Sequence, residues 1–426
     1  MQQLVTCGRY LAQADGSPFF WLGDTAWELF HRCDRKDAED YLDARARQGF
    51  TVIQAVALAE QEGLTVPNRY GRLPFLFTDG MPDPLRPDLE GSYSYWDHVD
   101  FILEAAEARG LRVALLPTWG DKFNKAWGKG PEIFDPENAR LYAAWLARRT
   151  ADRTNILWML GGDRPLETPE HRAVVDAMAA GIREGGSEGL ITFHPMGPRS
   201  SVEFVLDAPW IQIHTAQTGH GIEYSGGSDA MMRAMAAASP RPYLDSEPRY
   251  EDHPACFEPK LGYFWSADEC RQDLYWCLMA GACGHTYGNH CIWSMNDTAS
   301  DYFPFPWREV LCHPGAEQMH HAAGLRFRRD YFSFSPAQEL LLNQYPGPGH
   351  LAAGIGDGYA YLYSPLGLPI QADPAPLGAV RLRLLWFDPR TGEETLAGIL
   401  SGSEPATLVP PAQGKGRDYV AVLEKA

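Results

Sequence analysis

The sequence lacks the marks of a disulfide-built or membrane-inserted protein. Its eight cysteines show no C-x-x-C pair and no regular spacing, so a disulfide framework is not indicated. The first nine residues lack the basic flank and apolar run of a signal peptide, and no stretch is apolar enough to span a bilayer. We therefore expect a cytoplasmic protein, with a secreted or periplasmic protein whose signal peptide has been removed as the alternative.

Positive charge is also scarce. The 37 Lys and Arg residues are outnumbered by 55 Asp and Glu residues, which gives a formal net charge of −18. A nucleic-acid backbone or an anionic membrane would be repelled by such a surface, so we expect neither as a partner. Aromatic residues make up 12% of the chain, and their flat faces are suited to packing against sugar rings, although most aromatic side chains belong to the core.

The chain is long enough for a barrel of about 250 residues or more followed by one small domain. Short apolar runs alternate with segments of helical period up to about residue 325, a pattern typical of repeated β–α units. We predict an α/β fold, a (β/α)8 TIM barrel over residues 1–328. Its eight predicted strands cover residues 19–22, 51–58, 111–119, 155–160, 190–194, 210–214, 242–245 and 285–293.

Two further segments break this pattern. Residues 60–94 hold several prolines and glycines with no sustained period, which predicts a long loop on the active-site face after the second strand. Beyond residue 329, turn sequences separate short apolar stretches at 340–345, 351–355, 359–363, 380–387 and 419–423. This spacing predicts a small antiparallel β-sandwich domain over residues 329–426.

Barrel enzymes carry their chemistry where strands end, so two acids stand out. Asp163 follows the fourth predicted strand and two glycines that allow a tight turn, and Glu247 follows the seventh. Hydrolysis of a glycosidic bond needs one carboxyl group that protonates the leaving oxygen and another that attacks or activates water. We predict Asp163 and Glu247 as this catalytic pair. The structural alternative is that each acid pairs with a neighbour, Asp163 with Arg164 and Glu247 with Arg249.

Other polar and aromatic residues at strand ends are candidates for substrate binding. We assign hydroxyl contacts to Asp24, Gln54, His194 and His214, and possible ring platforms to Trp27, Trp119 and Trp293. The histidines with Asp24 and Asp245 could also form a metal site, but the H-x-H pattern of a metallohydrolase is missing from the first strand. We therefore predict no metal and no cofactor.

Five stretches of the predicted barrel carry distinctive motifs: residues 19–30 (FFWLGDTAWELF), 41–54, 116–122 (LPTWGDK), 155–164 (NILWMLGGDR) and 246–251 (SEPRYE). Together they resemble one family, the apiosidase-like glycoside hydrolases, which include glycoside hydrolase family 140 and its relatives. The resemblance covers the whole barrel, and residues 385–392 (LWFDPRTG) look like the collagen-binding-type β-domain often joined to it.

The resemblance implies a glycosidase that acts on an oligosaccharide or glycoside, with a pentofuranoside as one candidate. It also implies an acid/base residue from strand 4 and a nucleophile from strand 7, positions that Asp163 and Glu247 occupy. Many relatives carry Asn-Glu at the end of strand 4, whereas this chain has Gly162-Asp163. We expect a retaining mechanism. A non-catalytic carbohydrate-binding protein and a metal-dependent barrel hydrolase are the alternatives.

Overall fold

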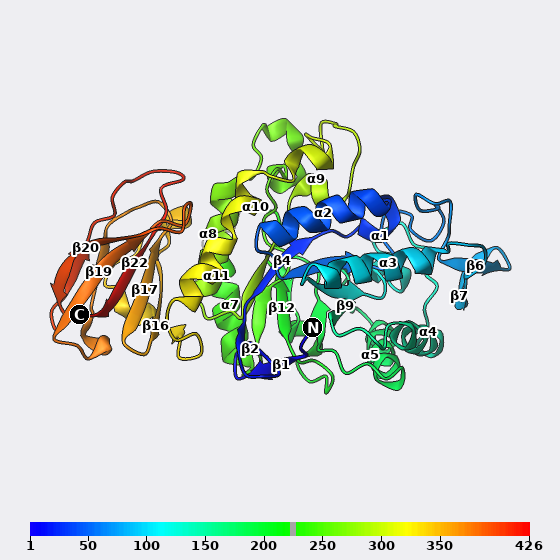
Figure 1. The fold of residues 1–426 in the computed structure, drawn as a ribbon, viewed down its shortest axis with the longest axis horizontal. Coiled ribbons are helices and arrows are strands. Elements are labelled where there is room, and N and C mark those ends of the chain that lie inside the picture. The colour runs from blue at the N-terminus through cyan, green and yellow to red at the C-terminus, as the bar shows by residue number, and fades with distance from the viewer. Residues whose placement is uncertain (222–226) are drawn as a thin grey trace.

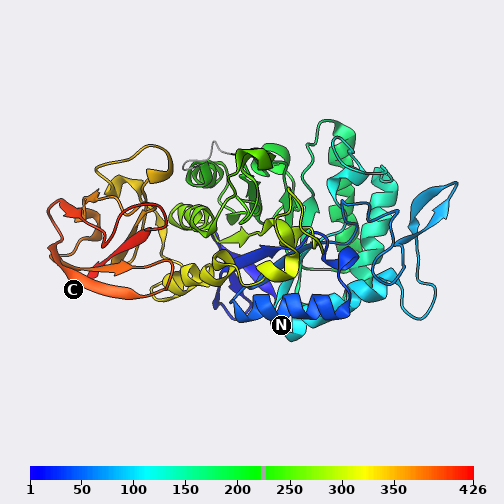
Figure 2. The same ribbon diagram turned by 90° about the horizontal axis from the view of Figure 1, so that it is seen from above.

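A computed structural model describes residues 1–221 and 227–426. A barrel ringed by helices occupies the centre of the molecule, and a β-domain packs at one side of it (Figure 1). Viewed from above, a hairpin projects at the end of the molecule opposite the β-domain (Figure 2). The predicted fold class, a (β/α)8 barrel followed by an antiparallel β-domain, is confirmed.

Nine strands of the described residues form the main sheet, in which β11 (Arg199–Ser200) pairs antiparallel at one edge and the others run parallel. A parallel bridge between Thr192 and Ile213 joins the two ends of the parallel series and closes the barrel. The parallel strands are β4 (Trp21–Thr25), β5 (Val52–Val56), β8 (Arg112–Leu116), β9 (Ile156–Gly161), β10 (Ile191–His194), β12 (His214–Gln217), β13 (Tyr243–Asp245) and β14 (Gly284–Tyr287).

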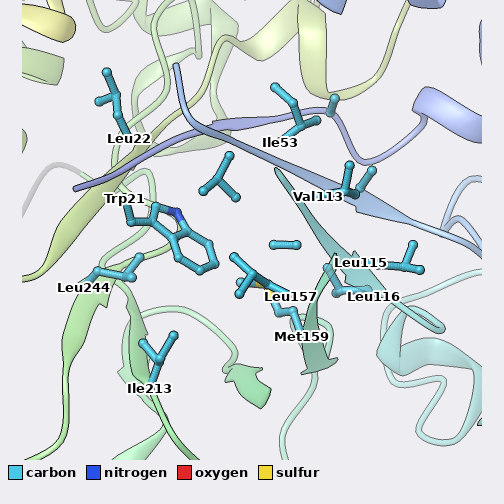
Figure 3. Close-up of a cluster of buried hydrophobic side chains, with 14 of the residues drawn as sticks. Trp21, Leu22, Ile53, Val113, Leu115, Leu116, Leu157, Met159, Ile213 and Leu244 are labelled. Atoms are coloured by element: carbon cyan, nitrogen blue, oxygen red, sulfur yellow. The ribbon is translucent and has the colours of Figure 1, made fainter. Parts of the chain in front are cut away.

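The barrel interior is packed with apolar side chains. Figure 3 shows the indole of Trp21 lying among Leu157, Met159, Ile213 and Leu244. Trp21 is fully buried, and its Nε1 donates a hydrogen bond of 3.1 Å to Oγ1 of Thr286 on β14. Because barrel strands alternate inward and outward side chains, Leu22 and Asp24 of the same strand face outward, towards the helices.

Capping residues mark the starts of three helices. Asp135 caps α4, Thr168 caps α5, each before a proline at the first helical position, and Ser266 forms a capping box at α8. No described helix is both long and apolar enough to span a bilayer. The helices are α1 (Leu29–Arg32), α2 (Arg35–Arg47), α3 (Tyr95–Ala108), α4 (Pro136–Arg149), α5 (Pro169–Glu184), α6 (Val202–Val205), α7 (Gly227–Ala238), α8 (Ala267–Met279), α9 (His290–Trp293), α10 (Pro314–Gln318) and α11 (His320–Phe327).

Several predicted strands are wrong in register or length, including the third, which ends at Leu116 and not at residue 119. The first continues to Thr25, so Asp24 lies inside β4 and not after it. The sixth begins at His214 and ends at Gln217, whereas the prediction ended it at His214. The eighth ends at Tyr287, and residues 290–293 form α9 because the side chain of Asn289 accepts a hydrogen bond from the Cys291 N–H and caps a helical turn.

The insert at residues 60–94 is more ordered than predicted. It contains a hairpin of β6 (Phe75–Thr78) and β7 (Met81–Pro87), whose second strand packs beside α4. A second small sheet, made of β1 (Leu4–Cys7), β2 (Tyr10–Gln13) and β3 (Pro18–Phe19), precedes the barrel.

The C-terminal domain consists of a six-stranded antiparallel sheet and a two-stranded sheet among the described residues. Residues 340–345 form no strand, contrary to the prediction, and the prediction missed β15, β18, β20 and β21. The strands are β15 (Ser335–Pro336), β16 (Ala352–Gly356), β17 (Tyr359–Ser364), β18 (Ile370–Ala372), β19 (Arg381–Phe387), β20 (Glu394–Ser401), β21 (Ala406–Leu408) and β22 (Tyr419–Lys425).

The two faces of the larger sheet pack against different partners. Ala360 and Leu362 of β17 belong to the apolar core between the two sheets. Tyr363 of the same strand faces the barrel, where its ring stacks on Tyr275 of α8 with a centroid distance of 5.2 Å. Arg271 of α8 pairs with Asp418 at 2.8 Å across the same contact. Helix α8 is therefore covered by the barrel on one side and by the C-terminal sheet on the other.

Candidate active site

Loops at the carboxyl ends of the barrel strands line a cavity of about 650 Å³. This is the end at which barrel enzymes carry their catalytic groups, and the size is in the range of small-molecule sites. Each parallel strand contributes at least one residue to the wall through its last residue or the loop after it. Among them, in strand order, are Trp27, Glu60, Trp119, Asp163, Pro198, Gln217, Glu247 and Trp293.

Asp163 stands on an unusual turn at the end of β9. Gly161, Gly162 and Asp163 all have positive φ, at 90°, 112° and 53°. A Cβ at Gly161 would lie 2.4 Å from the His194 carbonyl oxygen, and one at Gly162 would lie 2.7 Å from the Gly120 nitrogen. Both glycines are therefore required by conformation and by space, which confirms the predicted tight turn. Aspartate is among the few other residues that adopt this conformation readily.

The carboxyl of Asp163 is only partly accessible and has two neighbours that donate hydrogen bonds. Its side chain is 23% exposed. Arg164 Nη1 donates to Oδ2 at 3.0 Å, and Trp127 Nε1 approaches the same oxygen at 3.4 Å. Burial and the nearby negative charge of Glu247 raise the pKa of Asp163, an effect that Arg164 opposes. Burial and Glu247 outweigh Arg164 and Trp127, so the carboxyl of Asp163 retains its proton to higher pH than an exposed aspartate does.

Glu247 lies two residues after β13, at the opposite wall. His220 Nε2 lies 3.2 Å from Oε1, and His194 Nε2 lies 2.9 Å from Oε2 at an angle outside the range of an aligned hydrogen bond. Burial alone would raise the pKa of Glu247, but these two imidazoles outweigh it and lower the pKa to about 2. Glu247 is therefore ionised throughout the physiological range. Its other candidate partner, Arg249, pairs with Asp273 at 2.7 Å instead.

Strand-end reasoning overlooked a third carboxyl in this cavity. Glu60, in the insert after β5, forms an ion pair with Arg164 Nη2 and lines the same wall as Asp163. Burial, with smaller contributions from Asp121 and Asp163, raises the pKa of Glu60 to about 7 against the opposing effect of Arg164. The sequence does place Glu60 just after a predicted strand. It was overlooked because the insert that begins at Glu60 shows no sustained period.

The three predicted tryptophan platforms all line the cavity. Trp27 and Trp119 are 4% and 3% exposed, and their ring centroids lie 5.0 Å apart. Trp293 is less buried, and its Nε1 donates to Nδ1 of His290 at 3.2 Å. A further tryptophan, Trp127, is 57% exposed and also lines the cavity. The aromatic wall therefore extends from the buried floor to the surface.

None of the four predicted hydroxyl contacts lines the cavity. Asp24 faces outward from β4, where it pairs with Arg45 at 2.6 Å. Gln54 is fully buried inside the barrel, and its Nε2 donates to the Ser246 carbonyl oxygen at 2.9 Å. His214 contacts Ser201 Oγ at 2.9 Å, and burial lowers its pKa to about 4. The first and third errors follow from strand ends placed too early, so that residues within strands were read as loop residues.

His194 is in a different position from the one predicted. It is fully buried and contacts the catalytic candidate Glu247, not the open cavity. His220 and Tyr250, which do line the cavity, were missed. His220 follows the true end of β12, so a correct strand boundary would have drawn attention to it.

The cavity wall contains several buried polar atoms that have no hydrogen-bond partner within the described part of the chain. A ligand rich in hydroxyl groups could satisfy them. They are Trp119 Nε1, Gln217 Oε1, His220 Nδ1, Glu247 Oε2 and Tyr250 OH. Across residues 1–221 and 227–426, no group of three or more His, Cys, Asp or Glu residues has the arrangement of a metal site.

Comparison with known proteins follows the same division of the chain. The family model described as "Apiosidase-like, catalytic domain" matches residues 6–333. The model described as "Putative collagen-binding domain of a collagenase" matches residues 335–424. Among proteins of curated function, none matches the sequence.

Solved structures resemble the whole chain. A structure titled "Glycoside hydrolase" is 27% identical with a TM-score of 0.89, and the match covers 100% of this chain and 97% of the other. A glycoside hydrolase family 5 protein from Bacteroides vulgatus is also 27% identical with a TM-score of 0.89, covering 99% and 93%. An endo-1,4-β-mannanase from Rhizomucor miehei shares the fold at 12% identity and a TM-score of 0.53, covering 76% and 99%.

A barrel of this kind, with acids at the carboxyl ends of its strands and glycoside hydrolases as full-length structural relatives, defines the protein as a glycosidase. The predicted enzyme class is thus confirmed. The family match extends over most of the chain, and the chain belongs to the apiosidase-like glycoside hydrolase family.

Proposed function

We propose that this glycosidase hydrolyses its substrate with retention of anomeric configuration, with Asp163 as acid/base and Glu247 as nucleophile. The observation that carries the proposal is that one cavity contains two carboxyl groups whose pKa values are displaced in opposite directions. A protonated acid and an ionised carboxylate are the two groups that glycoside hydrolysis needs at the same time.

In the first step, Glu247 Oε2 attacks the anomeric carbon while Asp163 gives its proton to the departing glycosidic oxygen. The products of this step are a glycosyl ester on Glu247 and a free alcohol. In the second step, the Asp163 carboxylate removes a proton from water, the water oxygen attacks the anomeric carbon, and the ester bond to Glu247 breaks. Asp163 ends the cycle protonated, and Glu247 ends it ionised.

The substrate that we propose is a neutral glycan bearing a pentofuranoside, the sugar class to which apiose belongs. The aromatic wall of the cavity suits sugar rings, and its unpartnered polar atoms suit hydroxyl groups. The net charge of −18 disfavours a strongly anionic substrate. The family membership supports a furanoside without identifying the linkage.

The test combines a panel of furanosides and pectic fragments with the variant Glu247→Gln. We expect the variant to lose about 10⁴-fold or more in kcat/KM, because the amide cannot act as a nucleophile. Proton NMR of the first product formed by the wild-type enzyme should show the anomer of the substrate. Glu258→Gln, an exposed substitution in the same loop, serves as the control.

Two results would contradict this mechanism. Inverted product would mean that the second carboxyl activates water directly, and full activity in Glu247→Gln would remove this residue from the reaction. Activity abolished by a strong chelator would instead favour the metal-dependent alternative.

A further inference from the structure

Arg164 connects two carboxyl groups of the cavity. Its guanidinium is fully buried, with Nη1 3.0 Å from Asp163 Oδ2 and Nη2 paired with Glu60 Oε1. The ring of Trp127 covers its outer face at 4.4 Å. Glu60 comes from the loop after β5 and Asp163 from the loop after β9, so one cation joins two distant parts of the chain.

One positive charge cannot fully compensate two negative charges. Three other charged or titratable groups face this unit. Asp121 is paired with Lys122 at 2.7 Å, Glu247 adds a negative charge that raises the pKa of Asp163, and His194, which acts in the opposite direction, lies 2.9 Å from Glu247 Oε2. In a buried site, two like charges that share one counter-ion each make ionisation of the other harder. The proton affinities of Glu60 and Asp163 are therefore coupled, and by linkage the coupling is equal in both directions.

We propose that Glu60, Arg164 and Asp163 form one proton-linked unit, in which Glu60 is a positioning residue that sets how readily Asp163 releases and recovers its proton. The coupling itself depends on the contacts alone, and its consequence for catalysis rests on the proposed function. Glu60 touches Arg164 and acts on Asp163 through that residue and through its charge.

The arrangement suits a group that must act first as acid and then as base. While Glu60 is ionised, it partly neutralises the positive charge of Arg164. The guanidinium then stabilises the Asp163 carboxylate less, so Asp163 retains its proton more readily. When Asp163 has given its proton to the leaving oxygen, Glu60 takes up a proton from solvent, and the guanidinium of Arg164 is then free to stabilise the new Asp163 carboxylate. The raised pKa of Glu60, about 7, places this exchange near neutral pH.

Carboxyl ¹³C NMR titration of the purified protein without substrate tests the coupling. We expect Glu60→Gln to lower the pKa of Asp163 by about 1 unit, and Asp163→Asn to lower the pKa of Glu60 by a similar amount. Glu62→Gln, an exposed substitution two residues further along the same loop, should change neither titration. Glu60→Asp retains the charge and should restore the pKa of Asp163 towards its wild-type value.

The kinetic readout is the basic limb of the kcat/KM profile, which reports the acid of the free enzyme. In Glu60→Gln this limb should move about 1 unit to lower pH, because Asp163 loses its proton earlier. A uniform loss of kcat/KM with an unmoved limb would show that Glu60 merely supports the fold.

Independence of the two titrations would overturn the inference, even if the catalytic assignment is correct. The two titrations could instead prove coupled while Asp163→Ala keeps its activity. That result would support the coupling and refute the proposed catalytic mechanism. If Glu60→Gln fails to fold, the Glu60 titration in Asp163→Asn decides alone.

Discussion

Two aspartates of this barrel lie against a buried arginine, yet their surroundings differ. Asp24 and Arg45 are both fully buried, and Tyr41 OH donates a further hydrogen bond to Asp24 Oδ2 at 2.5 Å. Asp163 pairs with the equally buried Arg164, but its own side chain is 23% exposed to the cavity. Burial raises the pKa of both aspartates, against the opposing charge of the arginine.

The comparison separates what makes a carboxyl unusual from what makes it useful. A raised pKa and an arginine partner are common to both residues, so neither identifies a catalytic acid. Asp163 differs in having access to a cavity and a second carboxyl, Glu247, with the opposite pKa displacement in the same cavity. We expect substitution of Asp163 to affect chemistry and substitution of Asp24 to affect stability.

The largest effect should come from Asp163→Ala. Without a general acid, kcat/KM should fall by about 10² to 10⁴-fold on a substrate whose leaving alcohol needs a proton. An aryl glycoside with an acidic leaving group should lose far less, because its departure needs little protonation. Steady-state kinetics on both substrates, with the unfolding midpoint in urea as a fold control, measure the difference.

Equal losses on the two substrates would contradict the role of Asp163 as acid, because they would indicate damage to binding or folding. A fall in stability comparable to that expected for Asp24 would also remove the contrast between the two aspartates.

Asp24→Asn should have a large effect of the other kind. It leaves Arg45 buried with an uncompensated charge, which costs about 3–5 kcal/mol of unfolding free energy. The kcat/KM of the folded enzyme should remain unchanged. Urea unfolding measures the loss, and Asp40→Asn, which breaks an exposed pair with Lys36, should cost less than about 1 kcal/mol. A loss of activity without a loss of stability would place Asp24 in the chemistry after all.

The smallest effect concerns the other member of the catalytic pair. His220→Ala removes the imidazole beside Glu247 Oε1, so the pKa of Glu247 should rise by about 1 unit from about 2. Because Glu247 must be ionised to attack, activity is lost as the pH falls through this pKa, and the acid limb should move to higher pH. In His220→Gln the side-chain amide can still donate a hydrogen bond to Glu247, so the acid limb should move less than in His220→Ala. An unmoved acid limb would mean that His194 alone holds Glu247 ionised.

Most of the fold could be predicted from the sequence, because in most elements the capping and turn residues indicate the same structure as the pattern of buried apolar residues. The capped starts of α4, α5 and α8 depend on neighbouring residues only. The turn at Gly161 and Gly162 is marked locally by the two glycines, although His194 and Gly120 also leave no room for a side chain there. The strand β20 was missed because it lies at an edge, alternates poorly and pairs across an irregularity at Leu384 and Leu385. Edge strands bury too little to impose a clear pattern.

The site was predicted less completely, since its residues are far apart in the sequence. Asp163, Glu247 and three tryptophans were placed on the cavity by the rule that function follows strand ends. The same rule failed for Asp24 and His214. The ends of their strands were placed a few residues too early, so buried strand residues were taken for residues of the cavity wall. Glu60 was missed because the insert that follows β5 shows no sustained period, and His220 was missed because the end of β12 was placed too early.

Helix α8 gives the molecule a property that neither domain has alone. Its residue Trp276 is fully buried and donates to the His350 carbonyl oxygen of the C-terminal domain at 2.9 Å, and Arg271 is neutralised there by Asp418. Excision of residues 335–426 would leave an apolar stripe on the outside of the barrel and would remove Asp418 from Arg271, which would keep only its pair with Asp268 at 3.0 Å. The barrel and the C-terminal domain should therefore melt in one cooperative transition. A C-terminal domain taken from a relative would fit only if the outer surface of α8 were exchanged with it.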